Sequence, residues 1–415
     1  MHEIIKLSNG VRIICEKIPY VRSAAVGIFI DVGSRDEAPL QSGSAHFIEH
    51  MLFKRSSKHS AAELAFAMDA IGGQINAYTT RENTCFYARV LDTHLDTAIE
   101  LLAEMFFDCA FDEAETDSER GVILEEIGMY EDTPDDACYE KLMSGCYKGA
   151  LGRPVLGKPK TLAKMSGESL RSFKESHYTA GNIIISLCGN YESSHLEHIK
   201  ELFSGMEKSR HKSTRRAEYG THIAVRRKKT EQNQFCLAFP SSGVISDERF
   251  ALNLLTTVLG GGVSSRLFQN IREKYGLCYS IFAFQSTFKD TGLLSVATAV
   301  NKETEQKTLG LIGDELRLFA DKGVTEEELG RAREQAKSSL VMSLESTNSR
   351  MLKMGNSLMA LGKCLSPDEL IARYDAVTSS QINELARERF DFSQMSLSAL
   401  GKTADAETYT KALGL

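Results

Sequence analysis

Short apolar runs and helical periodicities alternate along this chain in an order that occurs twice. In the first half, apolar segments typical of β-strands are expected at residues 3–6, 11–16, 24–32, 74–78 and 84–90. Apolar positions at helical spacing predict helices at 61–71 and from about residues 95 and 113. In the second half the order recurs, with strands near 222–227, 232–239, 277–284 and 292–300 and helices at 247–259 and 303–321. The pattern predicts two homologous halves.

Each half is expected to be an α/β sandwich. Strands joined partly by hairpins, with helices grouped together, imply an α+β fold in which a mixed, largely antiparallel sheet carries helices on one face. A chain of 415 residues is long enough for two domains of about 200 residues. The stretch around residues 205–220 is rich in Lys, Arg and Ser, as an exposed linker would be. We expect an N-terminal domain at 1–208, a linker at 209–220 and a C-terminal domain at 221–415.

The pentad His-Phe-Ile-Glu-His at residues 46–50 is the most informative stretch of the sequence. On a helix, His46 and His50 lie one turn apart on the same face, which is the spacing that brings two imidazoles onto one Zn²⁺. Glu49 flanks that face at a place where a metal-activated water needs a general base. This His-x-x-Glu-His order is the inverzincin pattern, the inverse of the commoner zinc-protease motif. The alternative is a helix that carries two histidines by chance.

A third zinc ligand must come from elsewhere, and residues 117–127 offer carboxylates on a helical pattern. Glu119 and Glu126 are seven residues apart, so they share a helix face with Ile123 and would point inward together. Glu125 is rotated by about 100° and is expected to meet solvent. Buried carboxylates need a partner, and a metal ion is one. The alternative, an amphipathic helix whose glutamates are all solvated, is not excluded by this pattern alone.

The pentad, together with Glu126 in the run Glu-Arg-x-Val-Ile-x-Glu-Glu-Ile, resembles the M16 metallopeptidase family. This family includes pitrilysin, insulinase and the mitochondrial processing peptidase, and the size is similar to its short bacterial-type branch of about 45 kDa. Further similarity runs along nearly the whole chain, at 72–79, 152–157, 178–190, 259–268 and 271–280.

The resemblance implies a role for each matching residue. His46, His50 and Glu126 would bind one Zn²⁺ per chain, Glu49 would be the general base, and Glu119 would be an acid that supports the site from behind the ligands. Asn76 and Ala77 would hold the substrate backbone beside the metal. Arg272 and Tyr279 match the arginine–tyrosine pair that acts on bound peptide, and Tyr279 would also stabilise the developing oxyanion. From the residues alone, a helix-cap salt bridge and a core tyrosine would be the preferred interpretation of this pair.

The second half has no His-x-x-Glu-His pentad. It would therefore serve as a substrate wall, while the first half carries the metal. The resemblance implies that one chain forms half of a clamshell, and that two chains, a homodimer or a heterodimer with a related chain, enclose a chamber. Such a chamber would admit peptides and unfolded segments and would exclude folded proteins.

Composition limits the cellular compartments and the kinds of binding partner that are expected. A net charge of −7 argues against general nucleic-acid affinity, and no apolar run reaches the length of a membrane span. The nine scattered cysteines, without a Cys-x-x-Cys motif, are typical of reduced intracellular thiols. The N-terminus has neither the basic region nor the apolar core of a signal peptide, so a cytoplasmic location is expected. A mature protein whose leader had been removed would look the same.

Three hypotheses about function follow. The first is an active zinc metalloendopeptidase, a hydrolase that cleaves peptide bonds. The second is a non-catalytic or partner-dependent subunit of a heterodimeric peptidase, against which the intact pentad and Glu126 argue. The third is a zinc enzyme of other chemistry, such as a carbon–sulfur lyase with the same motif. Those lyases are much shorter and use a cysteine as the third ligand, so the length of this chain and Glu126 argue against that reading.

Overall fold

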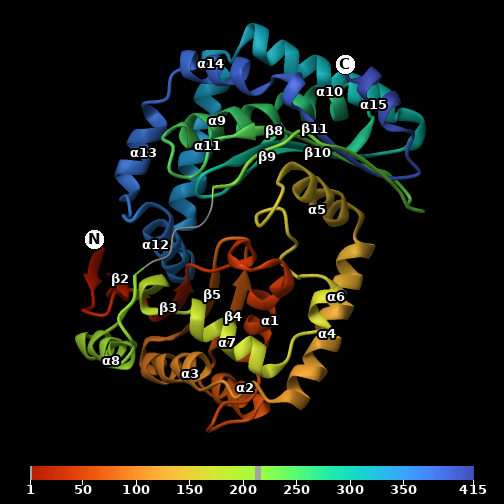
Figure 1. Ribbon diagram of the computed structural model, residues 1–415. Coiled ribbons are helices and arrows are strands. Elements are labelled where there is room, and N and C mark those ends of the chain that lie inside the picture. Colours follow the sequence, from red (N-terminus) through yellow and green to blue (C-terminus); the bar gives the residue numbers. More distant parts are fainter. Residues whose placement is uncertain (1, 211–215) are drawn as a thin grey trace. The chain divides into compact units, whose positions relative to one another are not determined.

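The computed structural model describes residues 2–210 and 216–415, and the chain divides into two compact units (Figure 1). Unit 1 consists of Met1–Ile127, Arg153–Arg215 and Val341–Ser366, and unit 2 consists of Gly128–Gly152, Arg216–Leu340 and Pro367–Leu415. The units therefore differ from two continuous domains, because each takes one segment from the other half of the chain. Residues 211–215 of the expected linker lie outside the described part.

Unit 1 is built on a six-stranded sheet with the order β1-β2-β6-β3-β5-β4. Only the β2–β6 pair is parallel. The strands are β1 (Glu3–Lys6), β2 (Arg12–Lys17), β3 (Ser23–Ile30), β4 (Gln74–Thr79), β5 (Thr84–Leu91) and β6 (Ile183–Gly189). The central strand β3 is buried from Ala24 to Ile30. Such a continuous apolar run indicates that both faces of the sheet are covered.

Unit 2 repeats this arrangement with the order β7-β11-β8-β10-β9. Its single parallel pair, β7–β11, corresponds to β2–β6 of unit 1, and β1 is an additional edge strand that unit 2 lacks among its described residues. The strands are β7 (Ile223–Arg227), β8 (Asn233–Ser241), β9 (Cys278–Thr287), β10 (Gly292–Val300) and β11 (Ser396–Gly401). The predicted α+β fold with two similar, largely antiparallel sheets is confirmed.

Helices surround both sheets, and those of unit 1 gather mainly on one face. Its principal core contains residues from α1 (Ser44–Leu52), α2 (Ala61–Ala70), α3 (Leu95–Asp108), α7 (Gly167–His177) and α8 (Ser193–Ser204), and α6 (Pro159–Leu162) is a short connection. Unit 2 contains α9 (Glu248–Gly260), α10 (Glu305–Lys322), α13 (Pro367–Asp375), α14 (Ser379–Arg389) and α15 (Ala406–Ala412). Two long helices, α4 (Glu113–Asp132) and α11 (Glu326–Ser343), begin in one unit and end in the other.

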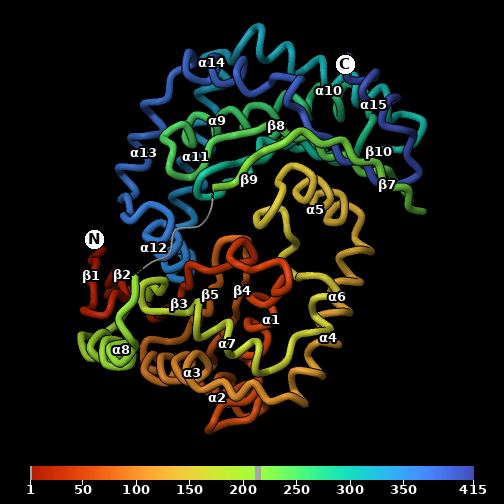
Figure 2. The backbone as a smooth tube through the Cα atoms, in the orientation of Figure 1, coloured from red at the N-terminus to blue at the C-terminus, as the bar shows by residue number. Residues whose placement is uncertain are grey.

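The second face of each sheet is covered by a helix from the other half of the sequence, which the periodicity did not predict. In unit 1 this helix is α12 (Thr347–Leu361), which lies beside β3 (Figure 2). Its Met351 and Leu358 belong to the same buried cluster as Phe29 of β3. In unit 2 it is α5 (Pro134–Cys146), whose Leu142 and other apolar residues pack on the strands β8, β10 and β11. We expected helices on only one face of each sheet. The structure adds one helix on the second face, which we call the exchanged helix because it comes from the other half of the sequence.

The contact between α12 and β3 leads to a stability prediction. A Cβ atom at Gly355 would lie 2.4 Å from the buried ring of Phe29. Gly355→Ala should therefore lower the free energy of unfolding by about 1–3 kcal/mol, as overpacking of a core does. Gly121→Ala is the matched control, because nothing lies within 4 Å of its Cβ position in α4. Urea denaturation should show the control unchanged or stabilised, and equal stability of both variants would contradict close packing of α12.

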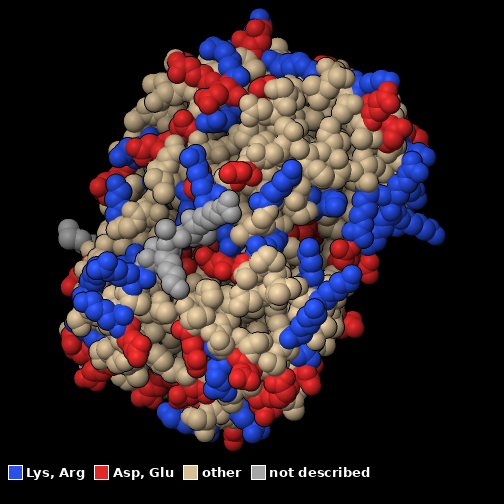
Figure 3. All heavy atoms as spheres, viewed as in Figure 1, with Lys and Arg blue, Asp and Glu red and all other residues tan. Residues whose placement is uncertain are grey.

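Charged side chains of both signs are interspersed on the face of the molecule shown in Figure 3. The basic run at the end of β7 is partly neutralised within unit 2, where Arg226 lies 2.6 Å from Glu131 and Lys228 lies 2.9 Å from Asp132.

None of the described helices combines the length and apolar character that a bilayer crossing requires.

Candidate metal centre

The helix that carries the pentad begins without a side-chain cap of its own. Its N-cap residue is Gly43, which has a φ of 101° and no polar side chain. The buried carboxylate of Glu37 takes over this role by accepting hydrogen bonds from the backbone N–H groups of Gly43 and Ala45, each at 2.9 Å. A carboxylate at a helix N-terminus is favourable because it satisfies unpaired donors and the helix dipole. Glu37 thereby anchors α1 immediately before its first histidine.

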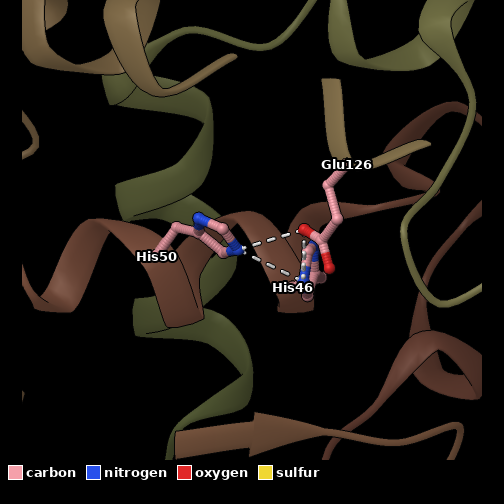
Figure 4. A group of neighbouring side chains, drawn as sticks. All are labelled: His46, His50 and Glu126. Carbon is pink, nitrogen blue, oxygen red and sulfur yellow. Dashed lines mark hydrogen bonds and ion pairs between the residues drawn. The ribbon is translucent and has the colours of Figure 1, made fainter. Parts of the chain in front are cut away.

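Three side chains from two helices converge within unit 1 (Figure 4). His46 and His50 of α1 have their Nε2 atoms 3.3 Å apart. Oε2 of Glu126, on α4, lies 3.5 Å from each of these two nitrogens. Among the described residues, this is the group of histidine, cysteine and acidic side chains whose donor atoms lie close enough together to hold a metal ion.

The spacing of these atoms fits a zinc ion. Ligands about 2.0–2.1 Å from a tetrahedral zinc stand about 3.3–3.4 Å apart, which agrees with the observed triangle. The buried Oε2 of Glu126 has no hydrogen-bond partner within residues 2–210 and 216–415. A buried carboxylate oxygen left in this state needs a cation or a donor. Two imidazoles and one carboxylate are also a donor set that is usual for catalytic zinc.

Glu119 lies behind His50 and not at the centre of the triangle. Its Oε1 atom is 2.8 Å from Nδ1 of His50, and its Oε2 atom is 2.5 Å from Nζ of Lys54. A carboxylate that accepts the Nδ1 proton fixes the tautomer in which Nε2 is free to bind a metal. Glu119 is thus placed where it could orient His50, and its carboxylate is paired with Lys54.

Glu49 contacts strand β4. The hydroxyl of Thr79 donates a hydrogen bond of 2.5 Å to its Oε2 atom. Burial raises the pKa of Glu49, and the Thr79 hydrogen bond opposes that rise. A raised pKa suits a group that must accept a proton near neutral pH.

The two histidines titrate in opposite directions. Burial and the neighbouring His50 hold the pKa of His46 well below its usual range. Burial alone would also lower the pKa of His50, but its interactions with Glu119 and Glu126 raise it to about 9. At neutral pH and without metal, His46 is therefore neutral and His50 carries a proton.

This difference predicts how zinc binding depends on pH. Zinc binds only the deprotonated imidazole, so each ion taken up between pH 6 and 8 should displace about one proton, from His50. Because His50 is protonated below its raised pKa, the apparent zinc affinity should fall about tenfold for each unit that the pH decreases. Calorimetric titration of metal-free protein in buffers with different ionisation enthalpies counts the released protons. Release of none would contradict a protonated His50.

Asn76 and Ala77 lie in β4, the edge strand of the unit 1 sheet, where they pair with Tyr87 and Phe86 of β5. Asn76 is exposed, and its Oδ1 atom accepts the backbone N–H of Ala77 at 2.8 Å. The outer edge of β4 is not paired with another strand among the described residues. An unpaired edge of this kind can add an extended peptide as a further strand.

Arg272 and Tyr279 belong to unit 2 and lie next to each other there. Arg272 is in the π-helix Phe268–Glu273, and its guanidinium carbon is 4.9 Å from the ring centre of Tyr279 in β9. The Tyr279 side chain is largely exposed, so it is not the core tyrosine that its sequence context allowed. The contact between them is a cation–π interaction.

Comparison with known proteins decides the family. Residues 12–159 match the family model for insulinase (peptidase family M16), and residues 164–336 match the model for the peptidase M16 inactive domain. The chain belongs to peptidase family M16. It is 42% identical over 384 residues to the uncharacterized zinc protease YmxG of Bacillus subtilis, which covers 92% of this chain and 94% of that protein. An uncharacterized zinc protease of Streptomyces coelicolor is 38% identical, covering 97% and 90% of the two chains.

Solved structures show the same M16 fold. A protease from Helicobacter pylori superposes with a TM-score of 0.88 at 23% identity, covering 97% of this chain and 99% of that one. A structure from Pseudomonas fluorescens described as a peptidase M16 inactive domain gives a TM-score of 0.89 at 19% identity, covering 97% and 98%. Membership of family M16 leaves no support for the lyase hypothesis.

Three residues of the site were not assigned by sequence reasoning. Lys54 lies just beyond the end of α1 at Leu52, and no sequence pattern indicated its contact with Glu119. Thr79 stands at the end of the motif that contains Asn76 and Ala77, but nothing in the sequence indicated its contact with Glu49. No sequence pattern indicated that Glu37 would cap α1. A cap that comes from a loop depends on how the chain folds back.

Proposed function

We propose that this protein is a zinc metalloendopeptidase that hydrolyses peptides or unfolded segments of polypeptide. The observation that carries the proposal is the triangle of His46, His50 and Glu126 donor atoms with Glu49 on the same helix as the two histidines. The names of the relatives in Bacillus subtilis and Streptomyces coelicolor support the same activity.

In this proposal His46, His50 and Glu126 hold one Zn²⁺ per chain. The ion, when bound, supplies a Lewis acid that acidifies water and polarises a peptide carbonyl. Glu119 keeps the His50 ring in its ligating tautomer through the 2.8 Å contact at Nδ1. Three protein ligands leave room for water and substrate, as in catalytic zinc sites.

Glu49 acts as the general base. It takes the proton of the attacking water and delivers it to the leaving amine, so that it returns to its ionised state after each turnover. Its burial favours this exchange, because a buried carboxylate holds a proton more readily than an exposed one. We assign Tyr279 to the stabilisation of the oxyanion through its exposed hydroxyl.

The substrate binds as an extended strand along β4. Main-chain hydrogen bonds at Asn76 and Ala77 would provide affinity for any unfolded peptide, because the backbone is the same in every sequence. Arg272, beside Tyr279, would also contact bound peptide. A site of this kind acts on peptides and unfolded segments, because most strands of a folded protein are already paired within their own sheets.

We propose that the active form is a pair of chains that encloses a chamber, either two copies of this chain or this chain with a related one.

We also propose that the protein is located in the cytoplasm. All nine cysteines are free thiols, which is compatible with a reducing compartment.

The test is hydrolysis of a quenched-fluorescent peptide library by the purified protein, with and without a chelator. Turnover should disappear with the chelator and return when zinc is added back. Folded substrate proteins should survive under the same conditions, and the same proteins should be cleaved after unfolding. A protein that binds one zinc per chain and cleaves no peptide would overturn the proposal in favour of a non-catalytic or partner-dependent subunit.

A further inference from the structure

We infer that Thr79 is a positioning residue for the general base and that it couples the substrate-binding strand β4 to Glu49. The inference rests on the proposed function, and it concerns contacts that lie entirely within unit 1. Thr79 itself would touch neither the metal nor the reacting atoms.

The first step is the hydrogen bond between the two side chains. Thr79 Oγ1 lies 2.5 Å from Glu49 Oε2 and 3.4 Å from Thr84 Oγ1, so the carboxylate is its closer acceptor. Thr84 donates its own proton to the carbonyl of Val32 at 3.0 Å. The hydroxyl proton of Thr79 is thus directed to Glu49. One carboxylate oxygen is held in this way, and the other would accept the proton from water.

The second step is that Thr79 is itself held in place. It pairs with Thr84 at the end of the β4–β5 ladder. The preceding residue, Tyr78, points to the other face of the sheet, where its hydroxyl lies 3.2 Å from Nδ2 of Asn356 in α12. Oδ1 of Asn356 accepts a hydrogen bond from Asn83 in the turn between the strands, at 3.2 Å. The exchanged helix α12 therefore fastens the end of β4 from behind.

The third step is the position of Thr79 on β4 relative to Ala77. Thr79 lies two residues after Ala77, so the two side chains are on the same face of the strand. A peptide that pairs with the free edge at Asn76 and Ala77 would align with the same strand that fixes the base. The hydroxyl would thereby keep the reacting carbonyl and the carboxylate in one geometry. Because misplacement by about 1 Å can cost about 100-fold in rate, loss of this hydrogen bond should lower kcat more than it changes KM.

The experiment compares Thr79→Val, which removes the hydroxyl and keeps the branched shape, with Thr79→Ser, which retains a hydroxyl. For Thr79→Val we expect a fall in kcat of about 10–100-fold, with KM and zinc content close to the unaltered protein. Thr79→Ser should recover most of that loss. Thr93→Val, an exposed threonine substituted in the same way, is the control and should leave kcat unchanged.

A crystal structure of the zinc-loaded Thr79→Val variant provides a readout that does not depend on activity. We expect the Glu49 carboxylate to leave its observed position while His46, His50 and Glu126 stay in place. The inference is overturned if Thr79→Val keeps its kcat within about twofold, or if Glu49 does not move. If the unaltered protein cleaves no peptide, the proposed function fails, and the position of Glu49 in the variant still decides the role of Thr79.

Discussion

Replacing Glu49 by glutamine is expected to lower kcat by about 10²–10⁴-fold, because the amide cannot accept the proton of the attacking water. The substitution keeps the size of the side chain and the oxygen that faces Thr79. Zinc content should therefore stay at that of the unaltered protein. Single-turnover and steady-state cleavage of a fluorogenic peptide measure the rate, and metal analysis of the same samples measures the zinc.

Glu100→Gln is the matched control for this variant, since Glu100 is an exposed glutamate on α3 of the same unit. It should retain full activity. A Glu49→Gln variant that remains active would remove Glu49 from the mechanism. Loss of zinc along with activity would instead indicate that Glu49 supports the ligands.

Glu126→Gln is expected to abolish zinc binding at micromolar metal, and activity with it. The charged oxygen that lies 3.5 Å from both imidazole nitrogens is replaced by a neutral amide group. Substitution of an outer partner of a metal ligand costs about 10–100-fold in affinity, and loss of a ligand itself should cost more. Competition with a chromophoric zinc chelator gives the affinity, and circular dichroism shows whether the helices remain.

Glu125, the neighbouring glutamate, provides the matched control for the Glu126→Gln prediction. Glu125 precedes Glu126 on α4, but its side chain is exposed. Glu125→Gln changes the net charge by the same amount and should bind zinc and cleave peptide like the unaltered protein. Equal loss of zinc in both variants would show that the charge of α4, and not the ligand position, holds the metal.

The candidate site was largely predictable because its geometry is local. His46, Glu49 and His50 lie within the nine residues of α1, so helical spacing alone sets their relative directions. Glu119 and Glu126 are related by two turns of α4, and their common face against Ile123 followed from the same spacing. The roles given to Asn76, Arg272 and Tyr279 came from family resemblance, and they stay predictions.

What the sequence by itself determined is therefore the set of local elements, their repeated order and the residues that share a helix face. These depend on periodicities of 2 and 3.6 residues, which any window of the chain displays. Only the tertiary structure decided which distant segments meet. The exchange of α5 and α12, the capping of α1 by Glu37 and the contact of Thr79 with Glu49 join residues that no periodicity relates. Such contacts form because a buried sheet face, an uncapped helix and a buried carboxylate each require a partner, and the folded chain determines which one is within reach.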